Sequence, residues 1–437
     1  MSQFDHDDVV SRYGRCIAKR VSEPFPIVLT EGEGVYLTDV KGKRYLDFWA
    51  GIATVSMGHG NKKIQEAVKA QMDKLVHCAS MSYYTIPALE LAEKLASIAP
   101  MKPCKALFLT SGSEATDVMM KTVRRATGRH EIITLFGAYH GRTMGAHSIS
   151  GPTGVFRKSP ALGPYPPGGI QVPAPYCYRC VLGLEYPECG IRCATIVEAF
   201  IEQATEGDVA AFFAEPVPGA GGIIVPPKDY FKVIKKILDR HQILLVLDEV
   251  QTGLGRTGKL WGAESYEVVP AVVTLAKALG NGYPISAVLA ASDVADALEP
   301  GDHYSTWGAN PVMCAAASAT LDYLTVNKLW ENAHQMGERM LKGLRELEQQ
   351  YALVGEVRGL GLMIGVELVR DKKTKEPAPE EAAAVRKACS DRGLIVGAGG
   401  VYKNVIRIQP PLVITEEHVD EALGILDRSL KEVSSNR

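Results

Sequence analysis

Three groups of residues in this chain follow short apolar runs and carry atoms that catalysis uses. The first group is Ser111, Gly112 and Ser113. It comes directly after the apolar run at 105–110, with Glu114 in the next turn, so we expect it to begin a helix. A helix N-terminus offers N–H groups and a positive dipole end, which can bind a phosphate. An ordinary helix cap is the alternative.

The second group is a single carboxylate, Asp248, which follows the apolar run I-L-L-V-L. A carboxylate that emerges from a buried strand is costly unless a cation or a strong donor meets it. One explanation is a structural ion pair with an arginine such as Arg256, and another is a helix cap. The functional explanation is a counter-ion for a protonated heteroaromatic nitrogen.

The third group is Lys277, the only charged residue in the stretch A-V-V-T-L-A-K-A-L-G-N-G-Y-P. Desolvation lowers the pKa of a lysine and makes its neutral amine a nucleophile. A lysine that extends from a strand edge into water is the alternative. Taken together, an anion-binding turn, a buried Asp and a desolvated Lys at one sheet edge are what pyridoxal 5′-phosphate (PLP) requires.

The composition argues against several other classes of protein. The chain has 437 residues, of which 46% are hydrophobic, and a formal charge of −2, so a broad cationic surface for nucleic acid is not expected. Its N-terminus is acidic, and we find no apolar run of about 18 residues, so we expect neither a signal peptide nor a membrane partner. Nine cysteines are too sparse for a disulfide scaffold and favour the cytoplasm.

Apolar runs alternate with amphipathic stretches through the middle of the chain. The runs lie at 105–110, 131–136, 209–216 and 243–250. Runs that are apolar on both faces suit buried parallel strands, and the stretch at 228–241 has helical spacing. This pattern predicts an α/β domain with a mostly parallel sheet. The segment at 159–175 is dense in Pro and Gly and is expected to be a long surface loop.

The two ends of the chain have a different sequence pattern from the middle. We expect a large α/β domain at 61–324 and a smaller α+β domain at 325–437, and we assign the N-terminal segment 1–60 to the smaller domain. In the C-terminal part, helices are expected at 328–351 and 380–392, and strands at 354–368.

Residues 253–258, G-L-G-R-T-G, match the glycine pattern of a dinucleotide site. The segment that follows does not open as a helix, and no Asp or Glu occurs at 268–292 to bind a ribose. We therefore interpret the motif as a glycine-rich turn near a site.

Over nearly its whole length, from G-V-Y-L-T-D-V-K-G-K-R-Y-L-D-F to I-R-I-Q-P-P-L-V-I-T, the chain resembles the class III, or ω-type, aminotransferases of PLP fold type I. The most specific stretches are L-L-V-L-D-E-V-Q-T-G-L-G-R-T-G-K-L-W and T-L-A-K-A-L-G-N-G-Y-P. The alanine–glyoxylate and 4-aminobutyrate types are the nearest subgroups. The resemblance implies ping-pong transfer of an amino group from an amino acid to a 2-oxo acid, in a homodimer or larger homo-oligomer with shared active sites.

The resemblance also implies roles for individual residues. Lys277 would bind PLP as an imine, Asp248 would pair with the pyridine nitrogen, and Arg407 would bind the substrate α-carboxylate. Tyr139 would stack on the ring, and Gln251 would reach the phenolic oxygen. The full set implied to bind the cofactor is Ser111, Gly112, Ser113, Tyr139, His140, Asp248, Gln251, Lys277 and Thr306, the last from the neighbouring subunit.

Subgroups of the family differ at two positions, and a further arginine is implied to lie near the pocket. Members that use 4-aminobutyrate or ornithine carry a Glu that masks the carboxylate-binding arginine, and Ala220 stands there in this chain. Dialkylglycine decarboxylases carry a Gln where this chain has Ile52. Arg142 could receive the distal carboxylate of 2-oxoglutarate or support its loop. These features favour α-amino donors such as alanine and acceptors such as pyruvate, glyoxylate or 2-oxoglutarate.

Other reactions stay open on the same scaffold. An amino-acid racemase is the first alternative, followed by an ω-amino acid aminotransferase or a decarboxylase. A PLP-binding protein without turnover is disfavoured, because Lys277, Asp248 and Arg407 are all present.

One segment is not explained by the resemblance. Cys177, Cys180, Cys189 and Cys193 form a C-x₂-C-x₈-C-x₃-C pattern. Four thiolates could bind zinc or an iron–sulfur cluster, or two disulfides could form, or the thiols could be free.

Overall fold

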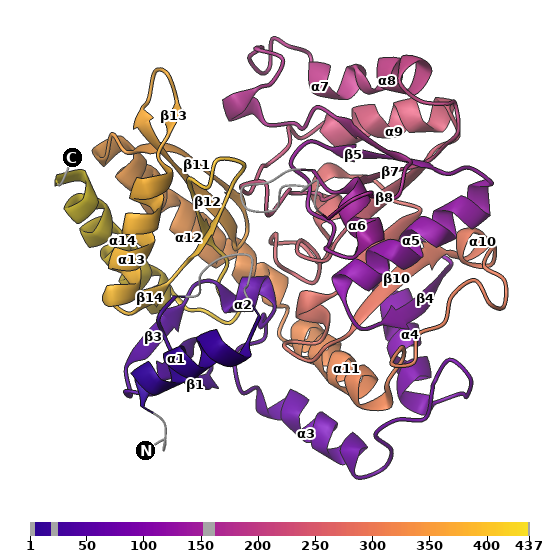
Figure 1. Ribbon diagram of the computed structural model, residues 1–437, viewed down its shortest axis with the longest axis horizontal. Helices are drawn as coiled ribbons and strands as arrows, with labels where there is room; N and C mark the ends of the chain where they lie inside the picture. The colour runs from indigo at the N-terminus through magenta and orange to yellow at the C-terminus, as the bar shows by residue number, and fades with distance from the viewer. Residues whose placement is uncertain (1–4, 19–24, 152–161, 436–437) are drawn as a thin grey trace.

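The computed structural model describes residues 5–18, 25–151 and 162–435. A seven-stranded sheet forms the centre of the large domain (Figure 1). Its strands, in spatial order, are β4 (Cys104–Leu109), β10 (Ser286–Ala291), β9 (Val272–Leu275), β8 (Leu244–Asp248), β7 (Val209–Ala214), β5 (Glu131–Leu135) and β6 (Gly169–Val172). Strand β10 is antiparallel to both neighbours, and the other pairs are parallel. The fold is therefore α/β with a mostly parallel sheet.

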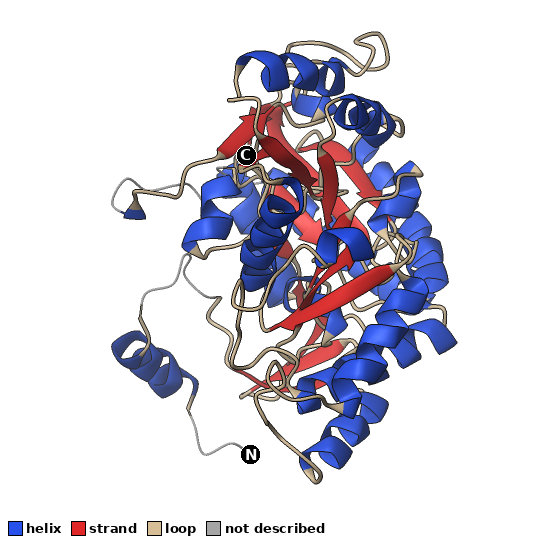
Figure 2. Cartoon of the chain, turned by 90° about the vertical axis from the view of Figure 1, so that its right-hand side faces the viewer, coloured by secondary structure: helices blue, strands red, loops and turns tan. Residues whose placement is uncertain are grey.

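Both faces of the sheet are covered by helices (Figure 2). Neighbouring strand residues point to opposite faces, so Phe212 belongs to one apolar cluster and Phe213 to another. This explains why the strands are apolar throughout. The helices of this domain are α3 (Lys62–Met72), α4 (Ile86–Ile98), α5 (Gly112–Thr127), α6 (Met144–Ile149), α7 (Arg192–Thr195), α8 (Val197–Gln203), α9 (Tyr230–Arg240), α10 (Ser292–Ala295) and α11 (Pro311–Val326).

The smaller part of the molecule joins both ends of the chain, as the indigo and yellow segments of Figure 1 show. Its N-terminal elements are α1 (His6–Cys16), β1 (Leu29–Glu33), β2 (Tyr36–Asp39), β3 (Arg44–Asp47) and the turn α2 (Ala50–Ala53). Its C-terminal elements are α12 (Leu329–Gln350), β11 (Val354–Leu360), β12 (Met363–Asp371), β13 (Glu376–Pro377), α13 (Pro379–Asp391), β14 (Leu394–Ile395), β15 (Gly397–Gly399), β16 (Val405–Ile408) and α14 (Glu416–Ser435). Strand β14 pairs with β3 in parallel, which connects the two ends.

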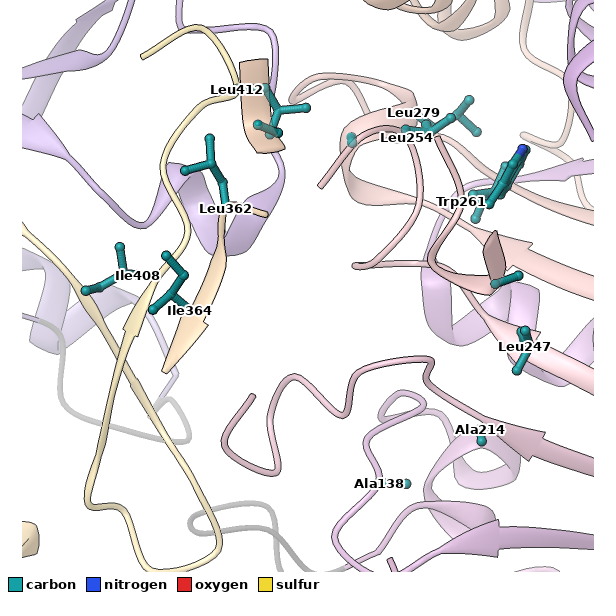
Figure 3. Packing of buried hydrophobic residues seen from close by; sticks show 14 of the residues in the cluster. Ala138, Ala214, Leu247, Leu254, Trp261, Leu279, Leu362, Ile364, Ile408 and Leu412 are labelled. Atoms are coloured by element: carbon teal, nitrogen blue, oxygen red, sulfur yellow. The ribbon is translucent and has the colours of Figure 1, made fainter. Parts of the chain in front are cut away.

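One apolar cluster extends across both parts (Figure 3). It includes Ile364 and Ile408 from the C-terminal sheet and Leu254, Trp261 and Leu279 from the large domain. All five side chains are almost fully buried. The position of the C-terminal sheet is therefore set by a shared core, because separating the two parts would expose this apolar surface to water.

The expected strands and helices, among them the strands at 354–368 and the helix that begins at 111–113, are confirmed within two or three residues at their ends. The expectation of a loop throughout 159–175 is wrong in part, because β6 occupies Gly169–Val172; residues 159–161 lie outside the described residues. The four residues G-I-Q-V contain no proline, so their backbone can pair with β5 at the sheet edge. None of the helices that the structure describes is long and apolar enough to cross a membrane.

Candidate active site

The predicted site residues gather around one cavity of about 730 Å³ at the carboxyl ends of the parallel strands. Strands β4, β5, β7, β8 and β9 all lead to this edge. The predicted residues in its lining are Ile52, Ser111, Gly112, Ser113, Tyr139, His140, Ala220, Asp248, Gln251, Lys277 and Arg407. Arg142 and Thr306 are exposed and lie outside the lining.

Asp248 is the last residue of β8, and only 4% of its surface is exposed. Its Oδ2 lies 2.8 Å from His140 Nδ1, and its Oδ1 accepts hydrogen bonds from Val250 N and Thr274 Oγ1. The alternative of a structural ion pair between Asp248 and Arg256 is therefore wrong. The Arg256 guanidinium instead donates to the Leu362 and Pro410 carbonyls and to Ser56 Oγ.

His140 holds this carboxylate in place. Its backbone N–H donates to Ser150 Oγ (3.0 Å), and its ring lies against Phe213, with 4.1 Å between the centroids. Because the backbone and the ring are both fixed, Nδ1 is held toward Asp248. The opposite ring nitrogen, Nε2, is buried without a hydrogen-bond partner among the described residues.

Glu215 is a second buried carboxylate that the sequence analysis did not single out as a site residue. It follows β7 and lines the cavity. Its two oxygens accept hydrogen bonds from Tyr139 N (3.0 Å) and Gly219 N (2.7 Å). Burial raises the pKa of Glu215, and the His140 side chain opposes this shift. A signal was present in the sequence, because Glu215 follows an apolar run just as Asp248 does.

Lys277 follows β9 and lines the cavity from a short 3-10 turn (Lys277–Leu279). Burial lowers the pKa of Lys277, and the carboxylates of Asp248 and Glu215 partly offset this effect. Its backbone φ is +38°, a strained conformation for a residue with a side chain. Asn281 supports the segment, because its side chain accepts from Met57 N and donates to the Gly58 carbonyl.

At the N-terminus of α5, the geometry of Ser111, Gly112 and Ser113 is compatible both with an ordinary helix cap and with a turn that could bind a phosphate. Ser111 is the helix cap, because its Oγ accepts from Glu114 N at 3.2 Å. Gly112 and Ser113 nevertheless face the cavity, at the positive end of a 16-residue helix. Ser113 Oγ accepts from Arg142 N at 3.0 Å, which anchors the neighbouring loop.

The carboxylate-binding candidate, Arg407, lies on β16 and is 5% exposed. Its Nη2 donates to Gln409 Oε1 (2.9 Å), whereas its Nε is buried without a partner among the described residues. Burial lowers the pKa of Arg407 to about 10. A Cβ at Gly399 would lie 2.5 Å from Arg407 Cδ, so the arginine can occupy this position only beside a glycine.

Ile52 reaches the cavity from an unusual turn. Ala50, Gly51, Ile52 and Ala53 all have positive φ, so the chain forms a left-handed turn at α2. Asp47 stabilises it by accepting hydrogen bonds from the N–H groups of residues 49 and 50. The side chain of Ile52 is 42% exposed as a result.

The four loop cysteines lie apart from this site and line a small cavity of their own. All four are free thiols in the structure. Burial raises the pKa of Cys193 to about 12, and the three other thiols add to the shift. Among the described residues, three closely spaced ligand atoms occur at Glu198, Glu202 and His241, and not in this loop. The alternative of two disulfides is therefore not observed, and a metal at the cysteines stays an untested alternative.

The Aminotransferase class-III family matches residues 17–430. The chain belongs to this family. It is 40% identical over 433 residues to a leucine/methionine racemase of Thermococcus litoralis, with 99% of this chain and 97% of the relative covered. It is 36% identical to a 5-aminovalerate aminotransferase of Pseudomonas aeruginosa, with 98% and 99% covered. A solved (S)-enantioselective omega-transaminase from Thermomicrobium roseum is 35% identical, with a TM-score of 0.91 and 99% and 100% of the chains covered.

Class III aminotransferases are PLP enzymes, and the residues around this cavity fit that cofactor. The N-terminus of α5 suits a phosphate, and Asp248 suits a protonated ring nitrogen. Gln251 Nε2 is a buried donor without a partner among the described residues, as a binding position for the phenolic oxygen requires. Tyr139 offers an aromatic ring, and Lys277 offers an amine with a lowered pKa. The individual roles of these residues stay predictions.

We predict that Lys277 holds PLP covalently. Reduction of the holoenzyme with borohydride, followed by peptide mapping, should place the label on Lys277. Lys277→Ala should fold normally and lose transamination. Lys403 is the other lysine in the cavity lining, so a label on Lys403 would contradict the assignment.

We predict that Asp248 keeps the ring nitrogen of the cofactor protonated, because a buried carboxylate favours the charged form of its partner. Asp248→Asn preserves the shape and removes the charge. It should lower the single-turnover rate of amino donors by several orders of magnitude. A variant with near-normal single-turnover rates would show that the charge of Asp248 is not required.

Proposed function

We propose that this enzyme transfers the amino group of an α-amino acid, such as alanine, to a 2-oxo acid by a ping-pong mechanism. The observation that supports the proposal is that the Arg407 guanidinium has no carboxylate partner among the described residues. Its hydrogen-bond partner is the neutral amide of Gln409, and none of the described carboxylates forms an ion pair with it. The guanidinium therefore keeps N–H groups for a substrate carboxylate, which suits its planar fork.

Ala220 supports the same conclusion. It lines the cavity with Arg407, and its carbonyl accepts a hydrogen bond from Gly400 N at 3.1 Å. The adjacent Gly399 would place a Cβ 3.4 Å from that carbonyl and 2.5 Å from Arg407 Cδ. A methyl group at position 220 cannot neutralise the arginine, whereas the Glu of ω-amine enzymes at this position would.

The residues of the cavity can then be given tasks. When bound, PLP supplies an electron sink for the bonds that change at the substrate α-carbon. Arg407 fixes the carboxylate next to that carbon. Lys277 Nζ removes the proton from the α-carbon of the amino donor and, in the second half-reaction, delivers a proton to the corresponding carbon of the oxo acid. Asp248, positioned by His140, stabilises positive charge at the cofactor-facing end of the cavity. The apolar side chain of Ile52 provides no donor that would assist loss of CO₂.

We predict that position 220 controls the choice of donor. In Ala220→Glu, a carboxylate beside Arg407 should lower kcat/KM for alanine by roughly tenfold or more and raise it for 4-aminobutyrate. Ala220→Gln is the matched control, because it adds similar volume without charge. The measurement is the single-turnover rate with each donor. Faster reaction of the wild type with 4-aminobutyrate, unchanged by the added Glu, would show that another part of the pocket sets specificity.

Racemisation is the second candidate, and the similarity to a leucine/methionine racemase supports it. A racemase uses the same carboxylate clamp and lysine but returns the proton to the α-carbon, so it needs no oxo acid. Its proton must reach both faces of that carbon. Three further ionisable side chains line the cavity and could carry this proton, Tyr283, Arg386 and Lys403.

We predict that amino transfer exceeds racemisation. L-alanine or L-methionine incubated with the holoenzyme in D₂O should keep its configuration over many turnovers when no oxo acid is added. Addition of pyruvate or glyoxylate should start multiple turnovers with L-methionine. Rapid loss of optical rotation without an oxo acid, at constant amino acid concentration and with deuterium uptake, would instead identify a racemase.

We also propose that the enzyme is a homodimer or a larger homo-oligomer with a cytoplasmic location. Thr306 lies outside its own cavity and is exposed, which suits a contact with a neighbouring subunit. Exposed apolar side chains occur next to it in the chain, at Trp307, and in a second segment, at Tyr84 and Ile86. The segments that carry them are joined by a hydrogen bond between Ser82 Oγ and Tyr304 Oη (3.2 Å). Such a patch favours association.

A further inference from the structure

A cluster of four cysteines lies apart from the active site, in the loop before α7 and in α7 itself. Cys177 and Cys180 come from the 3-10 turn Cys177–Arg179 and the residue after it, and Cys189 and Cys193 flank the start of α7. All four line one cavity of about 20 Å³. That volume accommodates a single water-sized species, so it suits one metal ion and not an iron–sulfur cluster.

The donor atoms around this cavity are soft. Besides the cysteines, its described lining contains apolar residues, two tyrosines and Arg192, but no carboxylate and no imidazole. Ca²⁺ and Mg²⁺, which prefer charged oxygen ligands, are therefore poorly served there. Four thiolates in a tetrahedral arrangement are a common ligand set of structural Zn²⁺.

The four thiols interact with one another, although none of them forms a disulfide. Burial raises the pKa of Cys193, and the other three thiols add to this shift. The pKa of Cys177 is raised by burial and then by Cys189 and Cys180. Each thiolate thus makes the next one harder to form, and a divalent cation among them would reverse this effect.

The sulfur atoms must converge to bind an ion. In the described structure no three of them lie within 4.8 Å of one another. A cysteine side chain has one torsion that moves its sulfur, so a change of rotamer brings the sulfur inward while the backbone stays in place. The ion itself supplies the attraction for this movement, because thiols must lose their protons before they bind it.

The backbone around the cluster is already held from two sides. Tyr176 Oη and Arg179 Nε both donate to the carboxylate of Glu367 on β12. On the other side, α7 packs against α9 of the large domain. The connecting residues 181–188 are mostly exposed and form no helix or strand. Burial of apolar surface therefore contributes little to joining the two sides.

We propose that Cys177, Cys180, Cys189 and Cys193 bind one structural Zn²⁺ ion. The four thiols release their protons to solvent as four Zn–S bonds form, and no oxidation state changes. The ion joins the segment that contacts β12 to α7, and it thereby ties the C-terminal sheet to the large domain. This role is independent of the reaction that the enzyme catalyses.

The first test is metal analysis of the full-length holoenzyme, purified without chelator. It should contain one zinc per chain, and Cys180→Ser and Cys193→Ser should each lower the zinc content about tenfold or more. Cys16→Ser changes an exposed thiol outside the cluster, so this matched control should keep the ion. His241→Gln disrupts the group that His241 forms with two glutamates, and it should keep the ion as well.

The wild-type protein provides a second readout, which holds even where a serine variant does not fold. Co²⁺ exchanged for zinc should give the visible bands of a tetrahedral four-thiolate ion, at longer wavelength than the bound cofactor. Removal of zinc with a chelator should lower the midpoint of thermal unfolding by about 5 °C or more, and added Zn²⁺ should restore it.

Three results would each overturn the assignment: iron with acid-labile sulfide, two disulfides among the four cysteines, or a metal-free protein that binds no Co²⁺. Zinc that persists in both cysteine variants and disappears in His241→Gln would place the ion at the group of His241 instead.

Discussion

The arrangement of the active site depends on one buried carboxylate. Asp248 ends a central strand beneath apolar side chains, where an unpaired charge would be strongly destabilising. Its partners are His140, Val250 and Thr274, which come from three different segments. Satisfying this one charge therefore fixes the loop after β5, the turn after β8 and the end of β9 relative to one another. Lys277 lies only three residues beyond Thr274, so the same contacts also fix its position.

A buried arginine connects this framework to the rest of the molecule. The Arg256 guanidinium donates to the Leu362 carbonyl in the C-terminal part and to Ser56 Oγ in the N-terminal part. Burial lowers its pKa to about 9. The glycines around it permit close backbone approach, because a Cβ at Gly361 would lie 2.4 Å from Gly258 N. The glycine pattern that resembles a dinucleotide motif thus serves to pack the two parts of the chain together, and the cavity lies between them.

The charges of the cavity divide it into two regions. Carboxylates occupy the end near the sheet, where Asp248 and Glu215 are held by His140 and backbone N–H groups. Guanidinium groups, Arg386 and Arg407, come from the C-terminal part and lack carboxylate partners among the described residues. This separation favours a cationic cofactor ring on one side and an anionic substrate on the other. The position of the C-terminal part against the large domain therefore determines which substrates the cavity can bind.

The sequence by itself determined the fold class and the residues that follow strands. Asp248 and Lys277 could be predicted because each interrupts an apolar run, and the carboxyl ends of parallel strands must meet at one edge. Glu215 carried the same signal. The His140–Asp248 contact, the true partners of Arg256 and the position of Arg386 were decided by the tertiary structure alone. They depend on contacts between segments about a hundred residues or more apart, and local patterns carry no information about which distant side chains will meet.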